Sequence, residues 1–72
     1  MDVDGRLEGV QRNLIHGTPY FRVYFSLPDA PDDIQQAQLP FDAFDETLTP
    51  GDAITITFLL KTVMRISRAA SR

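Results

Sequence analysis

Apolar and polar residues alternate along the C-terminal part of the chain, after a turn-forming segment at residues 49–52. Among the even-numbered positions from 54 to 66, only Thr62 is polar. The apolar members are Ile54, Ile56, Phe58, Leu60, Met64 and Ile66. Because successive side chains of a strand point to opposite faces, this pattern predicts a long strand with a buried even-numbered face and a solvated odd-numbered face.

The predicted strand is unusually long, and its outer face is not wholly polar. Strands commonly run for about five or six residues, so we expect a bend near Lys61 and Thr62, at which the stretch counts as two strands. Leu59 and Val63 lie on the face predicted to be solvated. Either the bend turns Val63 inward or a partner docks on this face. A helix over residues 59–70 is the alternative that the pattern leaves open.

Two further strands are predicted in the N-terminal half of the chain. Residues 3–15 carry spaced apolar side chains, and Gly5 and Gly9 among them indicate a bent or bulged strand. A turn is expected at residues 16–19, where a glycine can supply positive φ. Residues 20–27 alternate cleanly, so the two strands are predicted to form an antiparallel hairpin. The apolar face of the second strand consists of Phe21, Val23, Phe25 and Leu27.

The middle of the chain is predicted to be less regular. Prolines and aspartates at residues 28–33 indicate an exposed loop, and residues 34–39 indicate a short strand near a sheet edge. Residues 40–48 are expected to form one or two helical turns that Asp42 caps. A type II turn is expected at residues 49–52, because a proline followed by a glycine suits its central positions.

These elements predict an all-β fold with one short helix, arranged as a small five-stranded antiparallel barrel. Closure into a barrel removes the exposed edges that an open sheet of this size would have. The order of the elements resembles an OB-fold, in which a helix lies between the third and fourth strands, and it equally resembles SH3-like small barrels. The resemblance is one of architecture, and it assigns no functional residue. We predict one domain over residues 1–68 and a disordered basic tail over residues 69–72.

The 72-residue length makes the core only marginally sufficient, and the chain has no cysteine to supplement it. Self-association into a homo-oligomer is therefore favoured. The sequence contains no apolar run of about 20 residues and no basic, apolar leader, so no contact with a membrane is predicted. The absence of cysteine suits a reducing compartment, and a cytoplasmic location is expected.

Charge is distributed unevenly along the chain, although the net charge is only −3. Residues 30–52 include six acidic side chains and no basic one, whereas residues 61–72 include four basic side chains and no acidic one. Such a polarity suits a complementary partner or two copies that meet head to tail, although a solvated loop and a frayed tail would also produce it. The acidic total disfavours non-specific binding to nucleic acid or anionic lipid.

Candidate chemistry is sparse. His16 is the only histidine, so a histidine–cysteine metal site is excluded, and a serine triad would have to use this turn residue. The aspartates at residues 29–33 lack the ligand spacing of a calcium loop and are better explained by a solvated turn. We therefore predict no metal, no cofactor and no catalytic residue. A small enzyme remains a remote alternative.

The second strand presents one row of side chains with binding potential. With Phe21 and Val23 facing the core, Tyr20, Arg22 and Tyr24 stand together on the outer face. Two aromatic rings and a guanidinium can stack nucleic-acid bases or anchor a protein partner, although exposed tyrosines also suit strands without any ligand. The row would become a basic aromatic face if Arg12 and Arg65 lay on adjacent strands.

Two functions of different classes follow from these features. The first is a non-catalytic interaction or assembly module, whose partner is a protein or a second copy. The alternative is an OB-like module that binds single-stranded nucleic acid through its tyrosine-bearing strand. The hypothetical binding residues are Tyr20, Arg22, Tyr24, Leu59, Val63 and Arg65.

Overall fold

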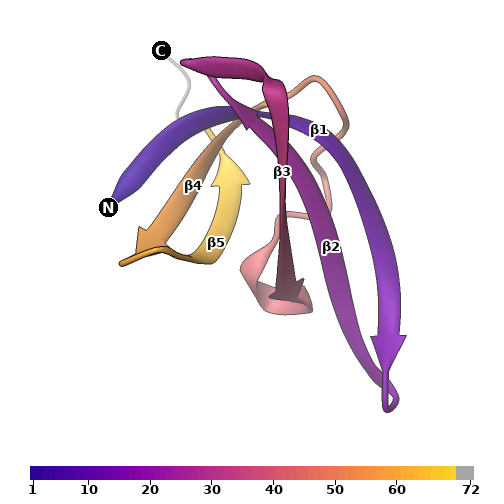
Figure 1. Ribbon diagram of the computed structural model, residues 1–72. Helices are drawn as coiled ribbons and strands as arrows, with labels where there is room; N and C mark the ends of the chain where they lie inside the picture. Colours follow the sequence, from indigo (N-terminus) through magenta and orange to yellow (C-terminus); the bar gives the residue numbers. More distant parts are fainter. Residues whose placement is uncertain (70–72) are drawn as a thin grey trace.

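The computed structural model of the chain describes residues 1–69, and five antiparallel strands account for most of them (Figure 1). The elements are β1 (Asp2–Ile15), β2 (Thr18–Leu27), β3 (Ala30–Pro40), the 3-10 turn η1 (Phe41–Ala43), β4 (Ala53–Leu59) and β5 (Thr62–Arg68). The all-β class and the antiparallel arrangement are therefore confirmed. Within residues 1–69, no helix has the length and hydropathy needed to cross a membrane. The predicted tail, apart from Ala69, lies outside the described residues.

All five strands belong to one sheet, in the order β3-β2-β1-β4-β5. The first three strands follow one another as hairpin neighbours, and β4 returns through the connection at residues 41–52 to pair with β1. Three consecutive strands and a fourth that returns beside the first form a Greek key. The long connection begins with η1 at the end of the edge strand β3. It then crosses to the side of β1 that faces away from β2, where β4 pairs.

The sheet is curved but not closed, so the predicted barrel is not confirmed (Figure 1). Its two edge strands, β3 and β5, are not hydrogen-bonded neighbours. Instead, the segment after η1 contacts the edge of β5 through one parallel bridge between Phe44 and Ile66. The Asp45 amide also donates a long hydrogen bond of 3.4 Å to the Ile66 carbonyl. The segment after η1 thus bridges part of the gap between the edge strands.

The core lies on the concave side of the sheet and uses the alternation predicted for β2. Phe21, Val23 and Phe25 are buried there, as expected from the sequence. The other buried apolar residues are Leu7, Leu39, Ala43, Phe44, Leu48, Ile54, Ile56 and Ile66. The connection contributes Phe44, whose ring centre lies 5.0 Å from that of Phe21. The segment that spans the open side of the sheet is therefore part of the core.

The irregularity predicted for the first strand is present as a bulge between Leu7 and Gly9. Glu8, at the bulge, accepts a hydrogen bond of 2.6 Å from the buried Ser26 hydroxyl. The strand ends in a two-residue turn in which His16 and Gly17 both have positive φ, at 51° and 80°. This geometry matches the type I′ turns that fit twisted hairpins, so β2 begins at Thr18, two residues earlier than predicted.

The loop predicted at residues 28–33 is wrong from Ala30 onward, because β3 begins there. Only Pro28 and Asp29 form the turn. The prolines argued against a central strand, but β3 is an edge strand, and an edge tolerates a residue without an amide hydrogen. The predicted edge position is thus confirmed, and the predicted short length is not.

The helical turns predicted over residues 40–48 reduce to the single 3-10 turn η1. Asp42 does not cap it, because the N-cap position is Pro40 and no side chain donates or accepts a capping hydrogen bond there. Phe44 already has extended φ and ψ of −134° and 135°, since it pairs with the edge of β5. The pairing with β5 replaces the helical continuation that local sequence favoured.

The C-terminal stretch forms two strands, as expected from its length, but they make a hairpin and not one bent strand. The chain reverses at Leu60 and Lys61, close to the expected bend, and β5 pairs back along β4. The helical alternative is wrong for residues 59–69. In the preceding turn, Gly51 takes a φ of 99° as predicted, and the Asp52 amide donates to the Thr49 carbonyl at 3.0 Å.

Candidate functional site

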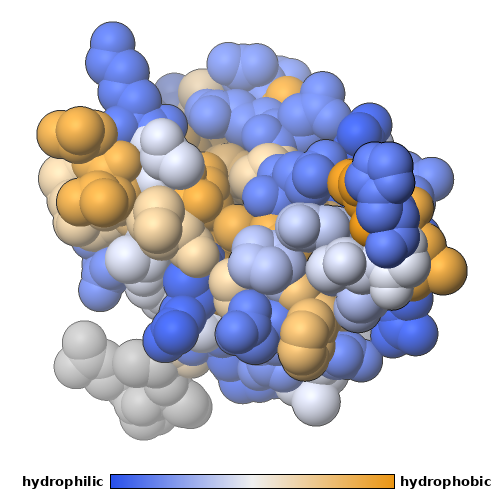
Figure 2. All heavy atoms as spheres, turned by 90° about the horizontal axis from the view of Figure 1, so that it is seen from below, coloured by the Kyte–Doolittle hydropathy of each residue, from blue (hydrophilic) through white to orange (hydrophobic). Residues whose placement is uncertain are grey.

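The end of the β4–β5 hairpin exposes a group of large apolar side chains. We call this group the hairpin patch; it consists of Leu59, Leu60 and Met64. Met1 is also exposed at this end, but it pairs with Phe58: its amino group donates to the Phe58 carbonyl at 2.9 Å, and the Phe58 amide donates to the Met1 carbonyl at 2.8 Å. The Met1 side chain therefore lies on the Phe58 face of the sheet, opposite to Leu59. Seen from below, apolar side chains gather at the left of the molecule, the side on which the hairpin lies in Figure 1 (Figure 2).

Leu60 is the most exposed member of the hairpin patch, with 91% of its surface accessible. It also has a φ of 57°, in the left-handed region where side chains with a Cβ are disfavoured. Glycine or asparagine would be expected at this position of a two-residue turn. A leucine here therefore combines an unfavourable backbone conformation with an unfavourable exposure of apolar surface.

The sequence placed Leu59 and Val63 together on the outer face, and the structure separates them. A register shift between Thr57 and Phe58 leaves Met64 as an extra residue in β5. Val63 consequently pairs with Phe58 and packs against the core. Leu59 remains on the outside, with 62% of its surface accessible. Of the two explanations left open for these residues, the inward turn holds for Val63.

Leu60 and Met64 were assigned by sequence to the buried face, and this assignment is wrong. Even-numbered side chains share one face only within a continuous strand. The turn at Leu60 interrupts the strand, so the alternation before it does not predict the faces after it. Two signals were available: the length of the predicted strand, which is more than twice the usual value, and the polar Thr62, at which the apolar alternation lapses. No glycine or asparagine marked the reversal.

The tyrosine row, Tyr20, Arg22 and Tyr24, lies on the outer face of β2, as the alternation predicted. Arg22 is exposed, and both tyrosines are half-buried. Residues paired across neighbouring strands share a face. The row is therefore flanked by the following residues of β1 and β3: Gly9, Gln11, Asn13, Gln36, Gln38 and Pro40. None of these flanking residues carries a charge.

The basic aromatic face that Arg12 and Arg65 would have completed does not form. Arg65 lies on β5, which is separated from β2 by β1 and β4. Arg12 pairs with Phe21 on the concave side, where its guanidinium lies 5.6 Å from the ring centre of Phe21. It also forms an ion pair of 3.1 Å with Glu46. Arg12 therefore attaches the connection to β1.

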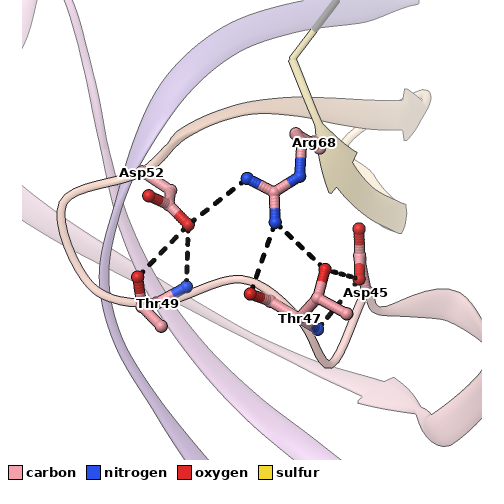
Figure 3. Close-up of polar contacts among 5 residues, drawn as sticks. All are labelled: Asp45, Thr47, Thr49, Asp52 and Arg68. Carbon is pink, nitrogen blue, oxygen red and sulfur yellow. Dashed lines mark hydrogen bonds and ion pairs between the residues drawn. The ribbon is translucent and has the colours of Figure 1, made fainter.

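A second polar cluster holds the connection against the end of β5 (Figure 3). Arg68 lies 3.6 Å from the Asp52 carboxylate and donates to the Thr47 carbonyl and hydroxyl at 3.3 and 3.0 Å. Asp52 in turn accepts a hydrogen bond of 2.9 Å from the Thr49 amide. The polar groups of this cluster are hydrogen-bonded or ion-paired with one another. This indicates that they hold the connection in place against β5.

Asp45 belongs to the same cluster, and among residues 1–69 it is the titratable group whose pKa departs clearly from its ordinary value. Its carboxylate accepts hydrogen bonds of 2.6 Å from the Thr47 hydroxyl and 2.9 Å from the Thr47 amide. These two hydrogen bonds lower the pKa of Asp45, against the opposing effect of desolvation and with a lesser contribution from the positive charge of Arg68. The ionised carboxylate therefore stabilises this turn.

A shallow pocket of about 280 Å³ lies where the connection meets β5. Its lining comprises Asp42, Ala43, Phe44, Asp45, Arg65, Ile66 and Ser67. One guanidinium beside two carboxylates favours no single charged ligand, and small-molecule sites are usually larger, at roughly 300–1,000 Å³. Within residues 1–69, no group of three or more metal-ligating side chains gathers. His16 lies exposed in the β1–β2 turn, and it does not line this pocket.

No known protein-family model, curated protein or solved structure matches the chain. The hairpin patch and the tyrosine row are therefore the two candidate binding surfaces.

Proposed function

We propose that this chain is a non-catalytic interaction module that self-associates through the hairpin patch. The observation that carries the proposal is Leu60, which is almost fully exposed in a backbone conformation that disfavours it. Both penalties would be relieved by glycine, so the leucine is explained by a contact that its side chain makes outside the monomer. Leu59 and Met64 extend the same apolar surface.

Self-association also suits the size of the molecule. A chain of this length buries a limited fraction of its unfolded surface, and oligomerisation is a common way to bury more. Contiguous apolar patches of a few hundred Å² on small proteins are often functional. The hairpin patch gathers three large apolar side chains, Leu59, Leu60 and Met64, at one end of the sheet, where a second molecule can cover them.

We propose further that the architecture is OB-like. The supporting features are the Greek-key order of β1 to β4 and the position of η1 between β3 and β4. A partly open Greek-key barrel of five strands is the general form of the OB-fold. The incomplete closure between β3 and β5 suits this form better than the SH3-like alternative.

Sedimentation velocity of the full chain from about 10 µM to about 1 mM tests the self-association, because weak complexes dissociate in this range. We expect the weight-average mass to rise with concentration. The variant L60G should remain monomeric while staying folded. The variant L14T removes an exposed leucine from the other hairpin and should associate like the unaltered chain. A constant monomer mass for the unaltered chain up to 1 mM would contradict the proposal.

The tyrosine row supports a second candidate function, the binding of single-stranded nucleic acid. The observation that favours it is the uncharged border around Arg22, with Gln11 and Gln38 paired beside it on either strand. The amides can donate to and accept from base edges, the tyrosine rings can stack on bases, and Arg22 can contact a phosphate.

Titration of a fluorescent oligonucleotide at low salt tests this second function. We expect binding at or below about 10⁻⁴ M, which non-specific contacts commonly reach. The variant R22Q should weaken binding and reduce its salt dependence, whereas R65Q removes the same charge from a distant strand and should have a smaller effect. Absence of binding below about 1 mM would remove this function.

A further inference from the structure

The outer face of β4 carries opposite charges on its two sides. Asp2 of β1 pairs with Thr57, and Thr57 pairs with Arg65 of β5. Paired residues share a face, so an exposed acid and an exposed base flank a central threonine, with roughly 10 Å between the outer strands. Within residues 1–69, neither Asp2 nor Arg65 takes part in an ion pair.

This layout complements itself under one particular symmetry. A twofold axis that lies in the plane between two such faces, parallel to β4, exchanges the two sides of the strand. It places Asp2 of one copy opposite Arg65 of the other, twice in the dimer. An axis in the same plane but perpendicular to β4 would place like charges opposite each other, which is unfavourable. The charges therefore select the axis parallel to β4.

The same axis brings the apolar residues of the hairpin together. Leu59 lies two residues along β4 from Thr57, on the same outer face, so each Leu59 meets its own counterpart near the axis. Both hairpins then point in the same direction, and their Leu60 residues lie at the same end of the dimer. Thr55, two residues before Thr57, continues the contact, and the exposed Asp4 of β1 pairs with it and accepts a hydrogen bond of 3.4 Å from its hydroxyl. The same axis places Asp4 of one copy opposite the uncharged Ser67 of the other, because Ser67 pairs with Thr55 on the β5 side.

We infer that the partner of the hairpin patch is a second copy of this chain, packed face to face through the outer faces of β4 and β5 about a twofold axis parallel to β4. This inference rests on the self-association proposed above and specifies its geometry. Two sheets packed this way keep their strands nearly aligned, at the spacing of about 10 Å that sheet sandwiches use. The interface is isologous, so it closes at a dimer.

The contact is small, and this sets the expected affinity. The face spans three strands only over the length of β4, whereas a standard interface covers about 800 Å² per partner. We therefore expect a reversible dimer with a dissociation constant in the micromolar range or weaker. The two exposed ion pairs should make the dimer weaker at high salt.

Charge reversal tests the geometry by sedimentation velocity of each variant and of mixtures. D2R and R65D should each weaken self-association by about tenfold or more, because two attractive pairs become repulsive. Mixed in equal amounts, the D2R and R65D chains should associate with each other at least as well as the unaltered chain does. The double variant D2R/R65D should recover self-association within about threefold. R22D makes the same charge change as R65D, but on β2, and should leave the dimer unaffected.

The outcomes separate this inference from the function on which it rests. If the unaltered chain associates and L60G does not, but the charge variants match the unaltered chain within about threefold, the proposed geometry is wrong and self-association stands. The geometry is also wrong if mixing the two single variants fails to restore association. A monomeric unaltered chain overturns both proposals.

Discussion

At the scale of single residues, Gly5 is the glycine with the least room for an added Cβ atom. A Cβ atom there would lie 2.7 Å from the Ile56 side chain and 2.8 Å from the Ser26 carbonyl oxygen. The carbonyl belongs to the backbone and cannot swing aside, so Gly5→Ala should force a shift of β1. We expect the free energy of unfolding to fall by about 1–3 kcal/mol, measured by urea denaturation.

Gly9→Ala provides the matched control on the same strand. Its added Cβ would lie 3.7 Å from the Tyr24 ring, which is an ordinary contact. We expect a change within about 0.5 kcal/mol of zero. Equal effects of the two substitutions would show that the close approach at Gly5 does not determine its cost.

Asp45 should make the attachment of the connection sensitive to acid. Its pKa is lowered in the folded chain by the hydrogen bonds from Thr47, and the ordinary value for an aspartate is about 3.9. A lowered pKa means that the stabilisation is fully present above the ordinary value and is lost as the pH falls through the folded value. The difference in stability between the unaltered chain and D45N should therefore shrink below about pH 4.

NMR titration of the Asp45 carboxyl carbon measures this pKa directly. The variant D45N is a suitable comparison because its amide keeps one oxygen acceptor for the Thr47 amide and hydroxyl. A midpoint for Asp45 above the ordinary aspartate value would contradict the expected direction. So would a D45N difference that grew toward low pH.

At the scale of elements, the β4–β5 hairpin stores unfavourable backbone energy in its turn. Leu60 has a φ of 57°, and a left-handed residue with a Cβ costs about 1–2 kcal/mol relative to glycine. Glycine also gains more entropy on unfolding, which offsets part of this. We expect Leu60→Gly to raise the free energy of unfolding of the monomer by about 0.5–1 kcal/mol, measured by urea denaturation at low protein concentration.

Leu60→Gly is thus expected to stabilise the monomer while it weakens self-association. A substitution that merely damaged the hairpin would lower both the stability and the self-association. If L60G lowers the free energy of unfolding, the turn does not carry the predicted strain, and Leu60 does not mark a docking surface.

At the scale of the whole molecule, Phe44 joins the two sides of the open sheet. It pairs with Ile66 at the edge of β5 and packs its ring against Phe21 of β2, and it is 6% exposed. Phe44→Ala should cost about 3–5 kcal/mol, because it removes a large core side chain from the place where no strand closes the sheet. Small domains have only about 5–15 kcal/mol in total, so the variant should be close to unfolding at 25 °C.

Phe41→Ala is the control, because Phe41 has the same side chain in the same connection but is 54% exposed. We expect it to cost less than about 1 kcal/mol. Circular dichroism during thermal unfolding compares the two variants. Similar melting temperatures for both would show that the bridge at Phe44 does not hold the sheet together.

The sequence predicted best where a strand is governed by its own alternation. In β2, Phe21, Val23 and Phe25 are buried and the tyrosine row faces outward, because the alternation persists from end to end. The position of the tyrosine row on the outer face could therefore be predicted. The hairpin patch could not, since two of its members, Leu60 and Met64, follow the same even-numbered pattern as the buried Ile54 and Ile56.

The sequence by itself determined the all-β class, the antiparallel N-terminal hairpin, the turn at Gly51 and most of the core, because alternation and turn residues act over neighbouring positions. Only the tertiary structure decided that the C-terminal stretch folds back as a tight hairpin at its expected break, how far β3 extends along the edge, and that Phe44 pairs with β5 in place of continuing a helix. Each of these depends on backbone pairing with another segment of the chain, and the pattern of one stretch does not encode which segment will pair with it. The exposed hairpin patch follows from the first of these decisions.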